Sequence, residues 1–141
     1  DMDELRQVPS EVQVTLDKDS NGQQSLIVNA QFEHTFNVLK AMLPKYHWNI
    51  KEYSVSHGTF KVEVEEENAE FYRERGVDNF SLQEGEYIVR VGWEQGKSVI
   101  TFCDNKDIPL ESNVVNRLYS GFSQALNKEF ALYEQQSKKS N

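Results

Sequence analysis

The stretch ESNVVNRLYSGFSQALNKEFALY, residues 111–133, decides the fold that this sequence predicts. Large apolar side chains recur in it at steps of three or four residues, which is the period of an α-helix with one apolar face. These side chains are Val115, Leu118, Phe122, Leu126, Phe130 and Tyr133. Ser112 is the expected N-cap, because its hydroxyl can accept a hydrogen bond from a first-turn N–H. An isolated helix of this kind is unstable in water, so the rest of the chain must supply a surface for it to cover.

The composition fits one globular domain with an acidic surface. The chain has 141 residues, of which 38% are hydrophobic and 27% charged, as in an ordinary soluble domain. Its 23 acidic and 15 basic side chains give a net charge of −8. This charge argues against nucleic acid and anionic lipid as partners, because both are bound through Lys and Arg. One cysteine allows no disulfide within the chain, and no apolar run approaches the roughly 20 residues that span a bilayer.

Six segments have the composition and alternation of β-strands. They are residues 11–16, 25–28, 48–53, 60–65, 87–91 and 98–103. In the clearest of them, Phe60, Val62 and Val64 alternate with charged residues. One face of the sheet is therefore expected to be buried and the other exposed to water.

Two shorter helices complete the pattern. The first is predicted from about residue 30 to Pro44, with Asn29 as its N-cap, and Pro44 is expected to end or distort it. The second is a short helix capped by Asn68 and closed by Gly76. The order of elements predicts an α+β two-layer fold, in which an antiparallel sheet of five to six strands is covered on one face by the first helix and the long C-terminal helix.

The residues with reactive side chains form no catalytic constellation. His34, His47, His57 and Cys103 could serve nucleophilic or metal chemistry, but no two of them have the spacing of a known ligand pair. Cys103 follows Phe102 in an apolar strand, where a buried and unreactive thiol is the usual outcome. We therefore expect no catalytic residues and no cofactor.

Two acidic stretches were considered as cation sites. Residues 17–22, DKDSNG, match the first half of an EF-hand calcium loop, but its twelfth position, which needs a carboxylate, is Val28. This stretch is predicted to be a turn. The second stretch is the acidic run Glu65, Glu66, Glu67 and Glu70. Carboxylates at the end of a strand are more often a solvated surface that protects the sheet edge, so no metal site is predicted.

Phe71, Tyr72 and Trp93 are the candidate partner-binding residues. They lie in connections between predicted elements, where large aromatic rings have less core to fill, and aromatic residues are enriched at protein interfaces. The alternative is that these rings fold back over the end of the sheet. Without catalytic or metal chemistry, the residues favour a binding or scaffold role.

Four local strings and the final helix follow one another in a recognisable order. The strings are residues 26–28 leading into 32–39, WNI at 48–50, HGTFKV at 57–62 and EGEYIVRVG at 84–92. In this order and spacing, over about residues 14–127, they resemble the family of BamC carboxy-terminal domains. BamC, also called NlpB, is the lipoprotein subunit of the bacterial outer-membrane β-barrel assembly machinery. The resemblance implies a helix-grip fold, an antiparallel sheet wrapped against a long C-terminal helix.

The resemblance also implies a function and a location. It implies a non-enzymatic accessory role in folding and inserting outer-membrane proteins, through contacts with the barrel subunit and other lipoproteins of the machinery. It places the full-length protein at the outer membrane of a Gram-negative bacterium, where a lipid anchor absent from this chain would hold it.

Several features of that family are missing from this sequence. Cys103 lies mid-chain and cannot be the lipid-modified cysteine, there is no extended amino-terminal segment, and only one helix-grip unit is present where the family usually has two. We therefore expect one domain of a longer protein. Residues 1–10 are expected to be a linker or mobile arm, 11–134 the helix-grip domain and 135–141 a polar tail.

A carrier of small apolar ligands is the alternative function. Helix-grip folds elsewhere hold lipids between the helix and the sheet, which would require a cavity lined by Phe122, Val62 and Val89. Because the apolar residues of the long helix are large, they are expected to fill this space.

A pair of substitutions tests which face of the long helix is buried. Phe122→Ala is expected to destabilise the fold by about 3–5 kcal/mol, because it empties a large core position. Lys128→Ala, on the polar face, is expected to change stability by less than about 0.5 kcal/mol. Urea denaturation of both variants measures the difference. Small and equal shifts of the two midpoints would mean that the buried face is assigned wrongly.

Overall fold

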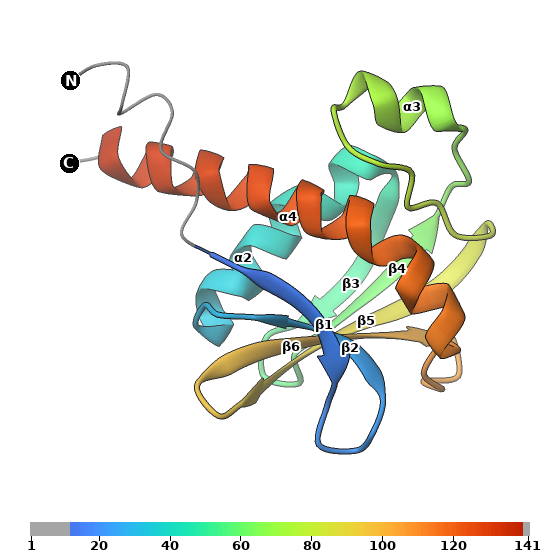
Figure 1. The fold of residues 1–141 in the computed structure, drawn as a ribbon, viewed down its shortest axis with the longest axis horizontal. Coiled ribbons are helices and arrows are strands. Elements are labelled where there is room, and N and C mark those ends of the chain that lie inside the picture. The colour runs from blue at the N-terminus through green and yellow to red at the C-terminus, as the bar shows by residue number, and fades with distance from the viewer. Residues whose placement is uncertain (1–11, 140–141) are drawn as a thin grey trace.

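A six-stranded antiparallel sheet with helices on one face forms the body of the protein (Figure 1). The computed structural model describes residues 12–139, with side chains up to residue 134. The elements in chain order are β1 (Val14–Lys18), β2 (Gln24–Val28), α2 (Phe32–Met42), the 3-10 helix η1 (Leu43–Tyr46), β3 (Trp48–Ser54), β4 (Thr59–Val64), α3 (Ala69–Glu74), β5 (Gly85–Glu94), β6 (Lys97–Asp104) and α4 (Ser112–Lys139). The strand order is β1-β2-β6-β5-β4-β3. The predicted α+β helix-grip architecture is confirmed.

The alternation of residues along β4 decides which face of the sheet is buried. Phe60, Val62 and Val64 are at most 1% exposed, whereas Lys61 and Glu63 between them are exposed on the opposite face. The prediction of one dry and one wet face is confirmed for this strand.

The edge strand β3 is irregular. Its pairing with β4 shifts register between Ile50 and Glu52, so that Lys51 is an extra residue on β3 and forms a β-bulge. Lys51 is exposed, and its ammonium group lies 3.5 Å from the Glu63 carboxylate of β4.

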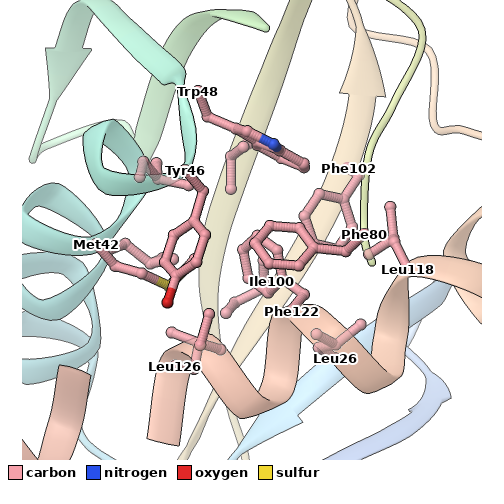
Figure 2. Close-up of a cluster of buried hydrophobic side chains, with 14 of the residues drawn as sticks. Leu26, Met42, Tyr46, Trp48, Phe80, Ile100, Phe102, Leu118, Phe122 and Leu126 are labelled. Carbon is pink, nitrogen blue, oxygen red and sulfur yellow. The ribbon is translucent and has the colours of Figure 1, made fainter. Parts of the chain in front are cut away.

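α4 lies across the buried face of the sheet, and its apolar stripe forms the centre of the core (Figures 1 and 2). Phe122 of α4 is fully buried. Its ring centroid lies 4.9 Å from that of Phe102 on β6, 5.4 Å from Trp48 on β3 and 5.5 Å from Phe80. Such edge-to-face and tilted contacts are the favoured geometry of aromatic pairs. The helix is therefore held to the sheet by rings that come from distant parts of the sequence.

The first helix ends near the predicted place but begins differently. α2 ends at Met42 and the chain continues as η1 with Pro44 in its first turn, because proline lacks the N–H that an α-helical bond needs. The prediction that Asn29 caps this helix is wrong, since α2 begins only at Phe32. The Asn29 side-chain oxygen instead accepts a hydrogen bond of 2.5 Å from the backbone N–H of Gln13. This hydrogen bond joins the segment between β2 and α2 to the residue that directly precedes β1.

The long helix is displaced from its predicted bounds at both ends. It begins at Ser112 itself, so Glu111 and not Ser112 occupies the N-cap position, and the Glu111 carbonyl accepts two first-turn hydrogen bonds. The helix continues to Lys139, into the segment 135–141 that was predicted as a polar tail. The predicted arm at residues 1–10 lies outside the described residues.

Gly121 lets the connection between α3 and β5 cross α4 at close range. A Cβ atom on this glycine would lie 2.0 Å from the carbonyl oxygen of Asp78 and 2.8 Å from the Phe80 ring. Around this crossing, Ser120 Oγ and Gln124 Nε2 donate hydrogen bonds of 2.6 and 3.0 Å to the Asp78 carboxylate. These bonds hold the pKa of the Asp78 carboxyl below its usual value. The connection is therefore fixed along the helix by both backbone contact and polar bonds.

Gly121→Ala is expected to destabilise the protein by about 1–3 kcal/mol, because the Asp78 backbone must move to admit a methyl group. The sign of this stability change is informative. Alanine is about 1 kcal/mol more favourable than glycine inside a helix, so helix propensity alone would stabilise the variant. Gly92→Ala is the matched control, because nothing lies within 4 Å of the position of its added Cβ. Thermal unfolding of both variants measures the effect. A melting temperature for Gly121→Ala at or above that of the wild type would show that the backbone around Asp78 can move aside without loss of stability.

Candidate functional site

The structure separates the three aromatic residues that the sequence nominated for partner binding. Phe71 and Tyr72 lie in α3, where they are 9% and 0% exposed. The Tyr72 ring lies 4.8 Å from that of Phe80, and burial raises the pKa of its hydroxyl to about 12. Both rings are buried because α3 folds back over the end of the sheet (Figure 1), which is the alternative that the sequence left open, and a role in partner binding stays a prediction. They belong to the core.

Trp93 is 49% exposed at the hairpin that joins β5 to β6. Two more apolar side chains are exposed at the same end of the sheet: Val55, at 51%, in the turn between β3 and β4, and Tyr53, at 46%, near the end of β3. The β3–β4 turn is tied to β5, because Val91 N–H donates a hydrogen bond of 2.7 Å to the Gly58 carbonyl. We call Tyr53, Val55 and Trp93 the hairpin-end surface.

Of this surface, only Trp93 is predicted from the sequence. Tyr53 stood inside a predicted strand, where a tyrosine is expected to pack, and its ring does contact Phe36 and Phe60 at centroid distances of 6.1 and 6.2 Å. Lys40 of α2 lies over the same ring at 4.3 Å. Tyr53 lies near the end of its strand, where fewer side chains cover the core. This position is the sequence signal that could have indicated its exposure.

Among the described residues, side chains fill the space between helix and sheet around Phe122. Phe122, Val62 and Val89, which would line a carrier site, are at most 1% exposed, and the rings around Phe122 fill the interior (Figure 2). A groove of about 560 Å³ lies elsewhere, between the first half of α4 and the connection that precedes β5. Its walls include Glu66 and Arg117 beside apolar groups, so it differs from the apolar pocket that a lipid carrier needs.

Cys103 lies on β6, on the face of the sheet opposite to α4, and is 1% exposed. The chain after β6 folds back beside it, since Pro109 pairs with Cys103 and Asp104 N–H donates to the Ile108 carbonyl at 2.8 Å. Burial, with a further contribution from the Asp107 carboxylate, raises the pKa of the thiol to about 11. The predicted buried thiol is confirmed.

None of the three histidines, all of which the structure describes, is hydrogen-bonded to Cys103. His34 packs against Phe130 at a centroid distance of 5.0 Å. His57 Nδ1 lies 2.9 Å from the Ser54 hydroxyl. His47 Nδ1 lies 2.7 Å from a carboxylate oxygen of Glu67. No thiol–imidazole pair therefore exists among residues 12–134.

The structure brings together a histidine and two glutamates that the sequence analysis had treated separately. His47 directly precedes β3 and Glu65 directly follows β4, and the pairing of Trp48 with Val64 sets them opposite each other. Glu65 N–H donates a hydrogen bond of 3.0 Å to the His47 carbonyl. Together with Glu67, they place one potential ligand atom each within 4.8 Å of the others. A register counted from the β3–β4 turn would have set His47 opposite Glu66, and the bulge at Lys51 shifts it to Glu65, so the sequence carried only part of this signal.

The half-motif of a calcium loop is a turn, as predicted. It connects β1 to β2, and Asp19 Oδ1 accepts hydrogen bonds of 2.9 Å from the N–H groups of Asn21 and Gln23. A carboxylate used in this way stabilises a tight turn. Within the described part of the chain, no helix combines the length and apolar character that crossing a bilayer requires.

The sequence was compared with known proteins. A profile of the family described as outer membrane protein assembly factor BamC-like C-terminal domain matches residues 14–126. Curated relatives that carry the name outer membrane protein assembly factor BamC include those of three species. That of Psychromonas ingrahamii is 26% identical over 126 residues, which cover 89% of this chain and 34% of the relative. Those of Ferrimonas balearica and Vibrio cholerae are 25% and 23% identical, and the matches cover 84% and 89% of this chain and 33% and 36% of the relatives.

These comparisons agree with the fold and with the order of the local strings. The chain spans about a third of the length of the relatives that it matches. The match at 14–126 includes all six strands, α2 and the half of α4 that covers the sheet. The chain belongs to the family of BamC-like C-terminal domains.

Proposed function

We propose that this chain is a non-enzymatic accessory domain of the outer-membrane β-barrel assembly machinery. It acts there in the folding and insertion of outer-membrane proteins, through contacts with the barrel subunit and partner lipoproteins. The observation that carries the proposal is the family match at 14–126, which runs through the whole sheet and into α4. Relatives named as outer membrane protein assembly factors support the same role. The full-length protein is lipid-anchored at the outer membrane of a Gram-negative bacterium.

A binding role also agrees with the chemistry of the described residues. The buried thiol of Cys103 has a raised pKa and no imidazole beside it, so it is not an activated nucleophile. The net charge of −8 opposes binding to nucleic acid. The filled core opposes the alternative of a carrier for apolar ligands.

The hairpin-end surface is the partner site that we propose. Trp93 is a large ring with half of its surface exposed, and tryptophan is the residue type most often found at the energetic centre of interfaces. Val55 and Tyr53 lie at the same end of the sheet and widen the apolar area. Phe71 and Tyr72 are not part of this site, because burial leaves them no surface to offer.

The non-enzymatic role predicts an unreactive thiol. At pH 8 a thiol with a pKa of about 11 is a thiolate in about one molecule in a thousand, and the thiolate is the form that reacts. The folded protein is expected to react with a thiol reagent at least about a hundredfold more slowly than the chain in concentrated guanidinium. Equal rates in the two states would reveal an accessible thiolate and would reopen an enzymatic role for Cys103.

Binding to the machinery tests the proposed function and its site together. The immobilised chain is expected to retain the solubilised assembly machinery of the same bacterium. Trp93→Ala is expected to weaken this retention about tenfold or more, as the loss of a central interface ring does. Ile108→Ala is the matched control, because this side chain is 57% exposed but follows the opposite end of β6.

The possible results separate the function from the site. If the wild-type chain retains nothing, the proposed role of this domain is contradicted. If the wild type binds and both variants bind as well as it does, the domain contacts the machinery through another surface. Trp93 and Ile108 are both at the surface, so both variants are expected to fold. Circular dichroism of each variant checks this expectation.

A further inference from the structure

We propose that His47, Glu65 and Glu67 form a binding site for one divalent transition-metal ion, for which Zn²⁺ is the best-suited ion. Each residue offers one ligand atom, and these atoms lie within 4.8 Å of one another. Imidazole nitrogen and carboxylate oxygen are the ligands of many zinc sites, in which three protein ligands leave a further position for water or another group. This site is separate from the hairpin-end surface and does not depend on the proposed function.

The imidazole distinguishes this cluster from the acidic run around it. Ca²⁺ and Mg²⁺ take oxygen ligands, six to eight for Ca²⁺ and six for Mg²⁺, so three side chains of which one is a histidine suit them poorly. Nitrogen ligands instead favour Zn²⁺, Ni²⁺ and Cu²⁺. Glu66 and Glu70 belong to the same acidic run but not to the ligand group. The two ligating carboxylates and a neutral imidazole balance the charge of the ion.

The sheet assembles the site before any ion arrives. His47 and Glu65 are held opposite each other by the register of β3 and β4 and by the backbone hydrogen bond of 3.0 Å between them. Glu67 already lies 2.7 Å from His47 Nδ1. Ligand atoms on tetrahedral zinc lie roughly 3.3 Å apart, because each is about 2.0–2.2 Å from the ion. The ligand atoms therefore start within 4.8 Å of one another and must come to about 3.3 Å apart when an ion binds.

Neighbouring groups orient two of the three ligands. Asn49 Nδ2 donates a hydrogen bond of 2.6 Å to Glu65 Oε2, and the His47 ring packs on Phe71 at a centroid distance of 4.8 Å. Such contacts around the ligands usually strengthen metal sites. They also give the aromatic ring of Phe71, which the sequence analysis had assigned to a partner, a role in holding the imidazole.

The nearby cations are engaged elsewhere. Lys45 is paired with the carboxylate of Glu129 on α4 at 2.9 Å. The guanidinium of Arg75 lies 3.5 Å from the centre of the Phe71 ring and donates hydrogen bonds to the Lys45 and Phe71 carbonyls. Neither of them is paired with Glu65 or Glu67, so the cluster keeps a negative charge that attracts a cation.

Calorimetric titration of the purified chain with zinc chloride tests the site. The wild type is expected to bind one Zn²⁺, and Glu67→Gln is expected to weaken that binding about tenfold or more. His47→Asn is expected to do the same. Asparagine is chosen because His47 has a φ of 63°, a left-handed conformation that asparagine tolerates better than alanine. Glu66→Gln removes the same charge from the neighbouring residue and is expected to leave the affinity within about twofold of the wild type.

NMR gives a second, local measurement. Zn²⁺ is expected to shift the imidazole signals of His47 and to leave those of His34 and His57 unchanged. The proposal is overturned if the wild type binds no Zn²⁺ at millimolar concentration. It is also overturned if Glu66→Gln weakens binding as much as Glu67→Gln, or if the His47 signals do not respond. Those results would mean that His47 and Glu67 form only a hydrogen-bonded pair on an acidic surface, without a metal site.

Discussion

The contact between α4 and the dry face of the sheet is the interaction on which the rest of the fold depends. Phe122 lies among Trp48, Phe80 and Phe102, so one residue of the helix joins two strands and a connecting segment. The sheet has alternating faces and can bury only one of them against the helices. The crossing at Gly121 belongs to the same contact, because the segment that carries Phe80 passes α4 there at close range.

Most of this architecture could be predicted from periodicity, and the clearest failure, the N-cap of α2, occurs where a distant residue decides. Asn29 looks like an N-cap in the local sequence, but its side chain is taken by the backbone of Gln13. α4 also continues through residues 135–139, for which the polar composition predicts a tail, because helix formation depends on local propensity as well as on an apolar stripe. By contrast, the cap at Asn68 was predicted correctly, because its hydrogen bond to Phe71 N–H is local.

The candidate sites were harder to predict than the fold, for the same reason. Whether Phe71 and Tyr72 face water depends on where α3 folds, and no pattern within six helical residues contains that information. At the hairpin that carries Trp93, the sheet extends beyond the helices that pack on its buried face, so the ring of Trp93 is exposed. His47 and Glu65 are far apart in sequence and meet only through the register of two strands. Regular pairing counted from the β3–β4 turn would set His47 opposite Glu66, and only the extra residue at Lys51 shifts the register so that Glu65 lies there.

The bulge at Lys51 affects how this domain can meet other polypeptides. A regular edge strand presents a row of unpaired N–H and C=O groups, to which an extended chain can add itself. β3 interrupts that row with an extra residue, and the extra residue is a lysine. An extended polypeptide therefore finds no continuous row of backbone groups along β3 with which to pair. Contacts at this edge of the sheet are left to side chains.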